Sequence, residues 1–148
     1  MHTQIRVPLT GFRLEYHFRL EGPAFSVNNY HYRDKRHKTS EAKAWETGVI
    51  SQLNEVKELS AIADDWRLYG GYFELDINCI YPAHVFYTQS GEISGRTFDC
   101  SNVEKPLQDL IFKQLGINDK LVKRLVSEKS VGTHYCIDIT IRLIKGDA

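Results

Sequence analysis

The chain has 148 residues, of which 42% are hydrophobic and 26% charged, and its formal net charge is zero. This length suits one domain spanning residues 1–148, and the composition excludes a disordered or low-complexity protein. No stretch approaches the ~20 apolar residues of a membrane span, and residues 1–11 lack a secretory signal pattern, so we expect a cytoplasmic protein with no membrane association.

The distribution of charge and the cysteines indicate which partners and metal sites to expect. Two basic stretches, His31–Lys38 and Lys120–Lys129, each hold four Lys or Arg residues against one acidic residue. They favour contact with an acidic partner, although solvated charge is the simpler interpretation of either stretch alone. Cys79, Cys100 and Cys136 lie far apart without a CxxC pair, which favours free thiols and argues against a zinc site.

The first half of the chain predicts a strand, a loop and a helix. Apolar and polar residues alternate over Phe12–Leu20, as in a half-buried strand. The segment Glu21–Thr39 is polar, aromatic and basic, and loops of this length are usually functional or disordered. Apolar residues at three- and four-residue steps then predict a helix from Thr39 or Ser40 to about Ser60.

The second half adds three strands and one helix. A strand over Phe73–Tyr81 ends at Pro82, and the loop after it holds a possible short strand at Val85–Tyr87. Further strands are expected at Val122–Val126 and Tyr135–Leu143. A helix with Gly116 at its end precedes them, and its apolar residues are Leu107, Leu110, Ile111 and Leu115. The predicted class is α+β, a mixed β-sheet with helices on one face and the order β-α-β-α-β-β.

The segment Phe98–Asp119 is the most informative for chemistry. Asp99 stands before the predicted helix and Asp119 after it. A helix of about ten residues is ~15 Å long, so these carboxylates can meet only if the chain returns toward the helix start. Spacing alone does not predict that return.

This segment resembles the active-site motif of the RusA family of Holliday junction resolvases. Asp99 matches the first aspartate of the family's Asp-x-Asp-Asn-x-x-Lys run, and Asp119 matches the second member of its Asp-Asp pair. The other matching residues are Asn102, Lys105, Asp109 and Asn118. Pro23–Arg33 and Cys79–Pro82 are also similar to family segments, and the similarity spans roughly Phe18 to Leu143.

The resemblance implies a Mg²⁺-dependent endonuclease, with Mn²⁺ possible, that cuts four-way or other branched DNA as a homodimer. Carboxylate-bound Mg²⁺ activates water and relieves charge at the phosphate. The resemblance implies Asp99, Asp119 and Lys105 as catalytic residues, and Asp99, Asp119 and Ser101 as the metal site. The expected DNA contacts are Asn28, Asn29, Tyr30, Arg33, Lys35, Arg36, Lys38, Arg96 and Asn102.

Two departures from the family pattern keep other interpretations open. Ser101 replaces a carboxylate, and a hydroxyl is a poorer Mg²⁺ ligand. The loop Ala83–Thr97 offers only His84 and Arg96 as basic residues, where a family member has several arginines. A catalytically weak binder of branched DNA and an unrelated α+β protein-interaction domain are therefore the alternatives.

Simpler roles also exist for single residues of the motif. Ser101 and Glu104 fit a helix capping box, although Pro106 favours a helix start nearer Lys105. Asp109 fits a surface position and Asp119 a turn. Glu74 and Asp76 are candidates for a third metal ligand, but strand alternation predicts that both face solvent.

Overall fold

A computed structural model describes residues 11–29, 31 and 37–145. Its centre is a four-stranded sheet with the spatial order β1-β4-β2-β3. The strands are β1 (Phe12–Glu21), β2 (Tyr72–Pro82), β3 (Val122–Gly132) and β4 (Cys136–Lys145). β4 is antiparallel to both of its neighbours, while β2 and β3 pair in parallel. The last strand of the chain therefore lies inside the sheet.

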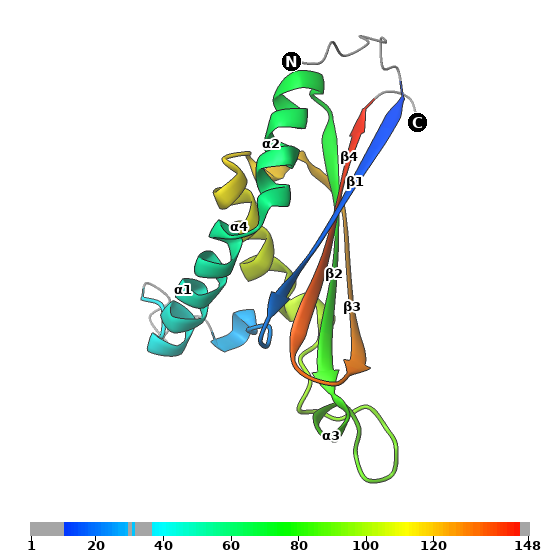
Figure 1. Ribbon diagram of the computed structural model, residues 1–148. Coiled ribbons are helices and arrows are strands. Elements are labelled where there is room, and N and C mark those ends of the chain that lie inside the picture. Colours follow the sequence, from blue (N-terminus) through cyan, green and yellow to red (C-terminus); the bar gives the residue numbers. More distant parts are fainter. Residues whose placement is uncertain (1–10, 30, 32–36, 146–148) are drawn as a thin grey trace.

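Three helices cover one face of this sheet (Figure 1). They are α1 (Ser40–Asn54), α2 (Lys57–Tyr69) and α4 (Glu104–Leu115). The predicted α+β class, with a mixed sheet and helices on one face, is confirmed. The predicted order is wrong in two places, because two helices rather than one lie between β1 and β2, and a short helical turn, α3 (Ala83–Phe86), precedes α4. Among the described residues, no helix is both long and apolar enough to cross a membrane.

The helix predicted to run to residue 60 instead ends at Asn54. Val56 has extended backbone angles, with φ −84° and ψ 104°, and α2 begins after it. Leu53 and Leu59, on either side of the break, are both buried. Both helices turn their apolar sides to the same sheet, so the spacing of apolar residues continues across the break and conceals it.

Two smaller predictions also need correction. Val85–Tyr87 is not a strand: Ala83–Phe86 forms a single helical turn, α3, closed by a hydrogen bond from the Tyr87 N–H to the Ala83 carbonyl at 3.0 Å. Tyr87 then pairs with Ile93 in an isolated bridge. The third strand is longer than predicted, because it continues to Gly132 along its parallel neighbour.

The core lies between the helices and alternate residues of the two interior strands. Phe73 and Phe112, on β2 and α4, are almost fully buried and pack edge to face with ring centroids 5.3 Å apart. Such aromatic pairs add about 0.5–1.5 kcal/mol beyond the area they bury. Other core residues on β2, α4 and β4 include Leu75, Ile77, Leu107, Ile111, Ile139, Ile141 and Leu143. This packing fixes α4, the helix of the candidate site, against β2 and β4.

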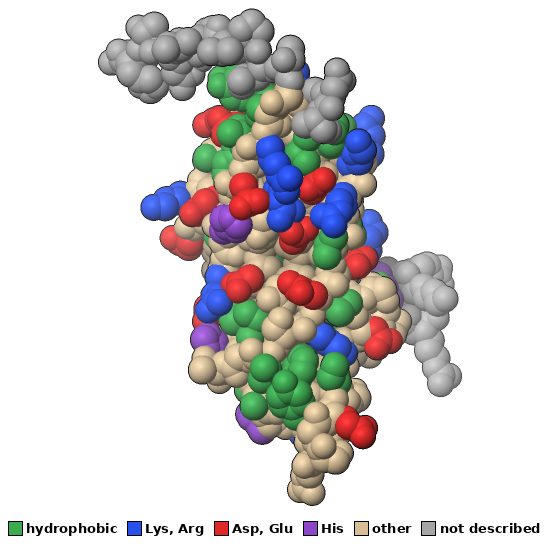
Figure 2. All heavy atoms as spheres, turned by 90° about the vertical axis from the view of Figure 1, so that its right-hand side faces the viewer, with side chains coloured by type: hydrophobic (Ala, Val, Ile, Leu, Met, Phe, Trp, Pro, Cys, Tyr) green, Lys and Arg blue, Asp and Glu red, His purple; other side chains and the backbone are tan. Residues whose placement is uncertain are grey.

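The opposite face of the sheet is open and carries interspersed positive and negative side chains (Figure 2). Arg142 lies among them, in register with Glu15 on β1 and Glu74 on β2. Its guanidinium forms ion pairs with Glu15, Glu74 and Asp76. Polar residues thus occupy every second position along most of β1, β2 and β4, as the alternation predicted.

Candidate functional site

The chain reverses direction at the end of α4. Gly116 has a φ of 72° in the left-handed region, and its N–H donates to the carbonyls of Phe112 and Lys113. The buried side chain of Ile117 anchors the next residue to the core. Asn118 then caps a 3₁₀ turn, η3 (Asp119–Leu121), by accepting the Lys120 N–H at 2.9 Å. This local chemistry directs the chain back along the helix.

The reversal brings Asp119 beside the first half of α4. Its Oδ2 accepts a hydrogen bond from the Gln108 Nε2 at 3.2 Å and lies 3.9 Å from the Lys105 Nζ. Lys105 also pairs with Asp109 one turn along the helix, at 2.6 Å. Lys105, Asp109 and Asp119 were all matched to the RusA motif, and the fold gathers them in one place. The sequence did not single out Gln108, because an amide on a helix face carries no distinguishing pattern.

The electrostatics of this group make Lys105 a permanent cation. Its hydrogen bond to Asp109, and to a lesser extent its nearness to Asp119, raise the pKa of the Lys105 ammonium above its usual value. The side chain is exposed and stays protonated at neutral pH. It can therefore neutralise negative charge on a bound group, but it cannot act as a base.

Asp99 and Ser101 lie before the helix, around a second 3₁₀ turn, η2 (Cys100–Asn102). The turn is tied to β3, since the Ser127 hydroxyl donates to the Cys100 carbonyl at 3.0 Å. Both residues are exposed. Among the described residues, the Asp99 carboxylate has neither a hydrogen bond nor an ion pair. Asp99 is thus presented to solvent from a turn whose backbone is anchored.

Ser101 does not cap α4. The helix begins at Glu104, and the residue before it, Val103, makes no side-chain capping bond. The capping-box interpretation is therefore wrong, and the alternative start, nearer Lys105, is closer to the structure. Pro106 falls in the first turn, where its missing N–H leaves no helical hydrogen bond unmade.

The proposed Mg²⁺ ligands were tested against this geometry. Mg²⁺ binds oxygen ligands and needs only one or two carboxylates beside its waters, so the donor chemistry of Asp99 and Asp119 fits. Within the described part of the chain, no third Asp, Glu, His or Cys completes a tight cluster with them. Glu74 and Asp76 do not serve, because they lie on the open face of the sheet, away from α4, and pair with Arg142. A Mg²⁺ site formed by Asp99, Asp119 and Ser101 therefore stays a prediction.

A groove lies next to Lys105, between α1, α4 and the described residues Val27, His31 and Lys38. Its volume is about 300 Å³. Apolar side chains form part of it, and Lys105, Lys113 and Lys38 supply positive charge, with Lys38 paired to Glu46 at 2.9 Å. The full lining is Val27, His31, Lys38, Glu46, Ile50, Lys105, Pro106, Asp109, Leu110 and Lys113. The loop expected to contact DNA therefore shares one groove with the helix that carries the motif.

Apart from Lys38, which lines the groove, the predicted DNA contacts fall into three groups. Asn28 and Asn29 are exposed in a 3₁₀ turn, η1 (Val27–Asn29), and Asn102 is half-buried in η2. Arg96 is held inside its own loop, where its guanidinium donates to the His84 carbonyl at 2.6 Å. Four predicted contacts lie outside the described residues: Tyr30, Arg33, Lys35 and Arg36.

The basic residues of Lys120–Lys129 do not share the groove. Lys123 lies over the Tyr72 ring, 4.4 Å from its centroid, on the edge strand β3. Lys129 points to the loop before η2, where it donates to the Thr97 hydroxyl at 2.9 Å. Lys123 and Lys129 thus lie apart from Lys38, the described lysine of the first basic stretch, which lines the groove.

Comparison with models of known protein families gives no match, and comparison with curated proteins gives none. The resemblance to the RusA family therefore rests on the motif residues themselves.

Proposed function

We propose that this protein is a Mg²⁺-dependent, structure-selective endodeoxyribonuclease that cuts four-way or other branched DNA. The observation that supports it is the return of the chain after α4, which sets Asp119 beside Lys105 and Gln108. Asp119 follows the end of α4 and Lys105 lies near its start, so only a reversal of the chain brings the two side chains together. A return of the chain toward the helix start is also what a shared site of Asp119 and Asp99 would require.

Each residue of the proposed nuclease site has a distinct role. Asp99 and Asp119 hold the metal ion, with Ser101 beside them. When bound, the divalent ion supplies an activated water and relieves charge on the phosphate. Lys105 neutralises the charge that develops on the phosphate oxygens, since its ammonium remains protonated. Asp109 orients that ammonium through the 2.6 Å ion pair.

DNA is recognised beside this group. The groove between α1 and α4 offers the exposed lysines Lys105 and Lys113, and the exposed amides of Asn28 and Asn29 lie in the neighbouring turn η1, all available for phosphate contacts. A four-way junction requires two symmetric cuts, and a C2 homodimer provides one active site for each. Such an enzyme would act in the cytoplasm on the cell's or a virus's DNA.

The experiment is cleavage of a synthetic four-way junction with Mg²⁺ or Mn²⁺. The wild type should cut, while Asp99→Asn and Asp119→Asn should lose at least about 100-fold in rate and still bind the junction. Asp64→Asn is the matched control, because Asp64 is an exposed carboxylate on α2 whose partner is Arg67. Cutting that persists in Asp119→Asn would refute the proposed site.

A second candidate is a protein that binds branched DNA but cuts it poorly. It is favoured by the exposed Ser101 where the family has a carboxylate, and by the absence, among the residues that the structure describes, of a third acidic ligand clustered with Asp99 and Asp119. Ser101→Asp should then increase cleavage without tighter binding. Affinity for DNA that does not fall as salt rises would count against both candidates and favour a protein or small-ligand partner.

A further inference from the structure

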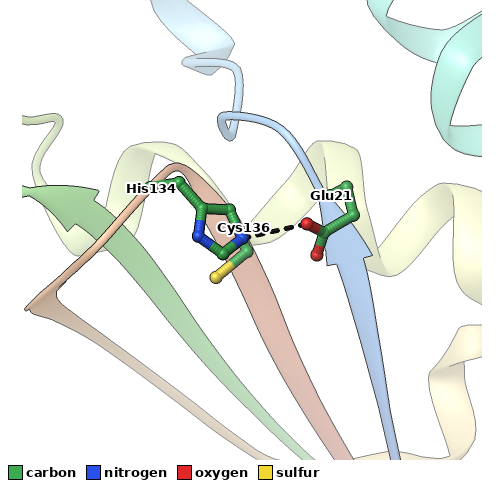
Figure 3. A group of neighbouring side chains, drawn as sticks. All are labelled: Glu21, His134 and Cys136. Carbon is green, nitrogen blue, oxygen red and sulfur yellow. Dashed lines mark hydrogen bonds and ion pairs between the residues drawn. The ribbon is translucent and has the colours of Figure 1, made fainter.

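Three potential metal-ligating side chains meet at the end of the sheet where β1 stops and β4 starts (Figure 3). Glu21 is the last residue of β1 and pairs in register with Cys136, the first residue of β4. His134 precedes Cys136 by two residues, in the β3–β4 connection. One ligand atom from each residue lies within 4.8 Å of the other two. These residues belong to neither the motif helix nor its groove.

The donor set is one that zinc uses. A thiolate, an imidazole and a carboxylate are its usual ligands, at about 2.0–2.3 Å. Tetrahedral geometry at those bond lengths puts neighbouring donor atoms roughly 3.3–3.8 Å apart. The His134 Nε2 and the Glu21 Oε1 are now 2.9 Å apart, so the two must separate by less than about 1 Å to admit an ion. Both side chains are more than half exposed, which leaves them free to move.

The surroundings orient the histidine as a ligand. The His134 Nδ1 lies 2.9 Å from the Thr133 hydroxyl, leaving the Nε2 directed at Glu21. Metal-binding histidines almost always donate an N–H from the second nitrogen, and the Nδ1 would donate to the Thr133 hydroxyl once the Nε2 binds an ion. Beneath them Cys136 is 2% exposed, so its thiol forms the floor of a shallow surface site. Arg19, which is near the thiol, does not occupy the site because both its Nε and its Nη2 bond to Asp138.

The same sheet contains a natural control. The His17 Nε2 lies 2.9 Å from a Glu15 oxygen, and its Nδ1 lies 3.0 Å from the Thr140 hydroxyl. This arrangement repeats the Thr–His–Glu geometry of His134. It lacks a cysteine, and Arg142 occupies its glutamate. Among the described residues, only the group at His134 combines three ligand types.

We propose that Glu21, His134 and Cys136 bind a borderline divalent transition metal, Zn²⁺ above all, with water in the fourth position. Binding displaces the thiol proton of Cys136 to solvent and leaves His134 neutral. The ion joins the end of β1 to the β3–β4 connection, where the Gly22 N–H already donates to the Tyr135 carbonyl at 3.1 Å. This site is independent of the proposed nuclease site, whose oxygen ligands suit Mg²⁺.

The test uses Co²⁺ as a spectroscopic probe and Zn²⁺ as a competitor on the metal-free chain. Wild type should give the thiolate-to-cobalt charge-transfer absorption, which Zn²⁺ abolishes. Cys136→Ser should lose that absorption, and His134→Asn should weaken Zn²⁺ binding by at least roughly 100-fold. His17→Asn and Cys100→Ser should match wild type. At a zinc concentration 100 times Kd, the wild-type Tm should rise by about 5–10 °C.

Other outcomes would overturn the proposal. Equal Zn²⁺ affinity in wild type and Cys136→Ser, or no wild-type binding at micromolar Zn²⁺, would each do so. Because Cys136 is buried, its substitution also perturbs packing. Glu21→Gln alters an exposed side chain instead and should still weaken binding at least 10-fold. An unchanged affinity in Glu21→Gln would remove the carboxylate from the site. No step of this test requires DNA cleavage.

Discussion

Arg142 should be the most stability-sensitive charged residue of the open sheet face. Its Nη2 lies 2.7 Å from an Asp76 oxygen and its Nε 2.8 Å from a Glu15 oxygen. The Arg142 side chain is 15% exposed, and that of Glu74, 3.7 Å away, is 18% exposed. Arg142→Met keeps the apolar stem in place but leaves Asp76 without a counter-charge and Glu74 with only the exposed Arg13, 3.9 Å away.

The expected loss of stability in Arg142→Met can be estimated from the ion-pair partners of Arg142. Breaking a buried ion pair by removing one member costs about 3–5 kcal/mol. Asp76 is 30% exposed, so the lower end applies, and the exposed Glu15 adds little because water screens it. We therefore expect the free energy of unfolding to fall by about 3 kcal/mol. For a chain of this size, that lowers Tm by roughly 6–12 °C.

Urea unfolding followed by circular dichroism measures this loss. Arg67→Met is the matched control: Arg67 is an exposed arginine paired with Asp64 on α2, and its loss should change stability by less than about 0.5 kcal/mol. The double variant Arg142→Met with Asp76→Leu should recover most of the loss, since Asp76 Oδ1 and Arg142 Nη1 are buried without hydrogen-bond partners. A loss below about 1 kcal/mol for Arg142→Met, or a double variant no more stable than the single, would refute the reasoning.

Two further predictions concern the backbone and pH. Gly71→Ala should destabilise the protein by more than about 2 kcal/mol, because its φ is +105° and a Cβ would lie 2.5 Å from the Ile144 carbonyl oxygen. Gly48 lies in α1 with open space around it, so Gly48→Ala should instead stabilise the protein by about 0.5–1 kcal/mol in the same urea assay. Equal changes in the free energy of unfolding for the two variants would contradict this reasoning. Burial raises the pKa of both the Cys79 thiol and the Tyr81 hydroxyl to about 12, from 9.0 and 10.0. Folding therefore favours the protonated thiol and hydroxyl, and the stability that each contributes is complete below its unfolded pKa. It is lost as pH rises from about 9 to 12, so Tm should fall over that range. The fall should be less steep in Cys79→Ala.

The strands and most helices could be predicted from sequence because their apolar spacing has a local cause. Phe12–Leu20 and Phe73–Tyr81 alternate since one face of each strand is buried, and both lie within observed strands. The break at Val56 escaped prediction because α1 and α2 bury the same side, so the spacing does not change there. The turn of Ala83–Phe86 was mistaken for a strand because four residues are too few to show a period.

The candidate site was also predictable only in part from the sequence. Gly116 was recognisable as a helix end, but the direction in which the chain leaves it depends on Ile117 entering the core. The contact of Asp119 with Lys105 and Gln108 follows from that direction.

The sequence by itself determined the α+β class, the polar open face of the sheet and the motif residues that carry the resemblance. Only the tertiary structure decided which of them meet. Glu21 and His134 are 113 residues apart, and the register of β1 with β4 joins them. Local periodicity reflects which side of an element is buried, whereas register and chain reversal depend on packing between distant segments, which no short stretch of sequence encodes.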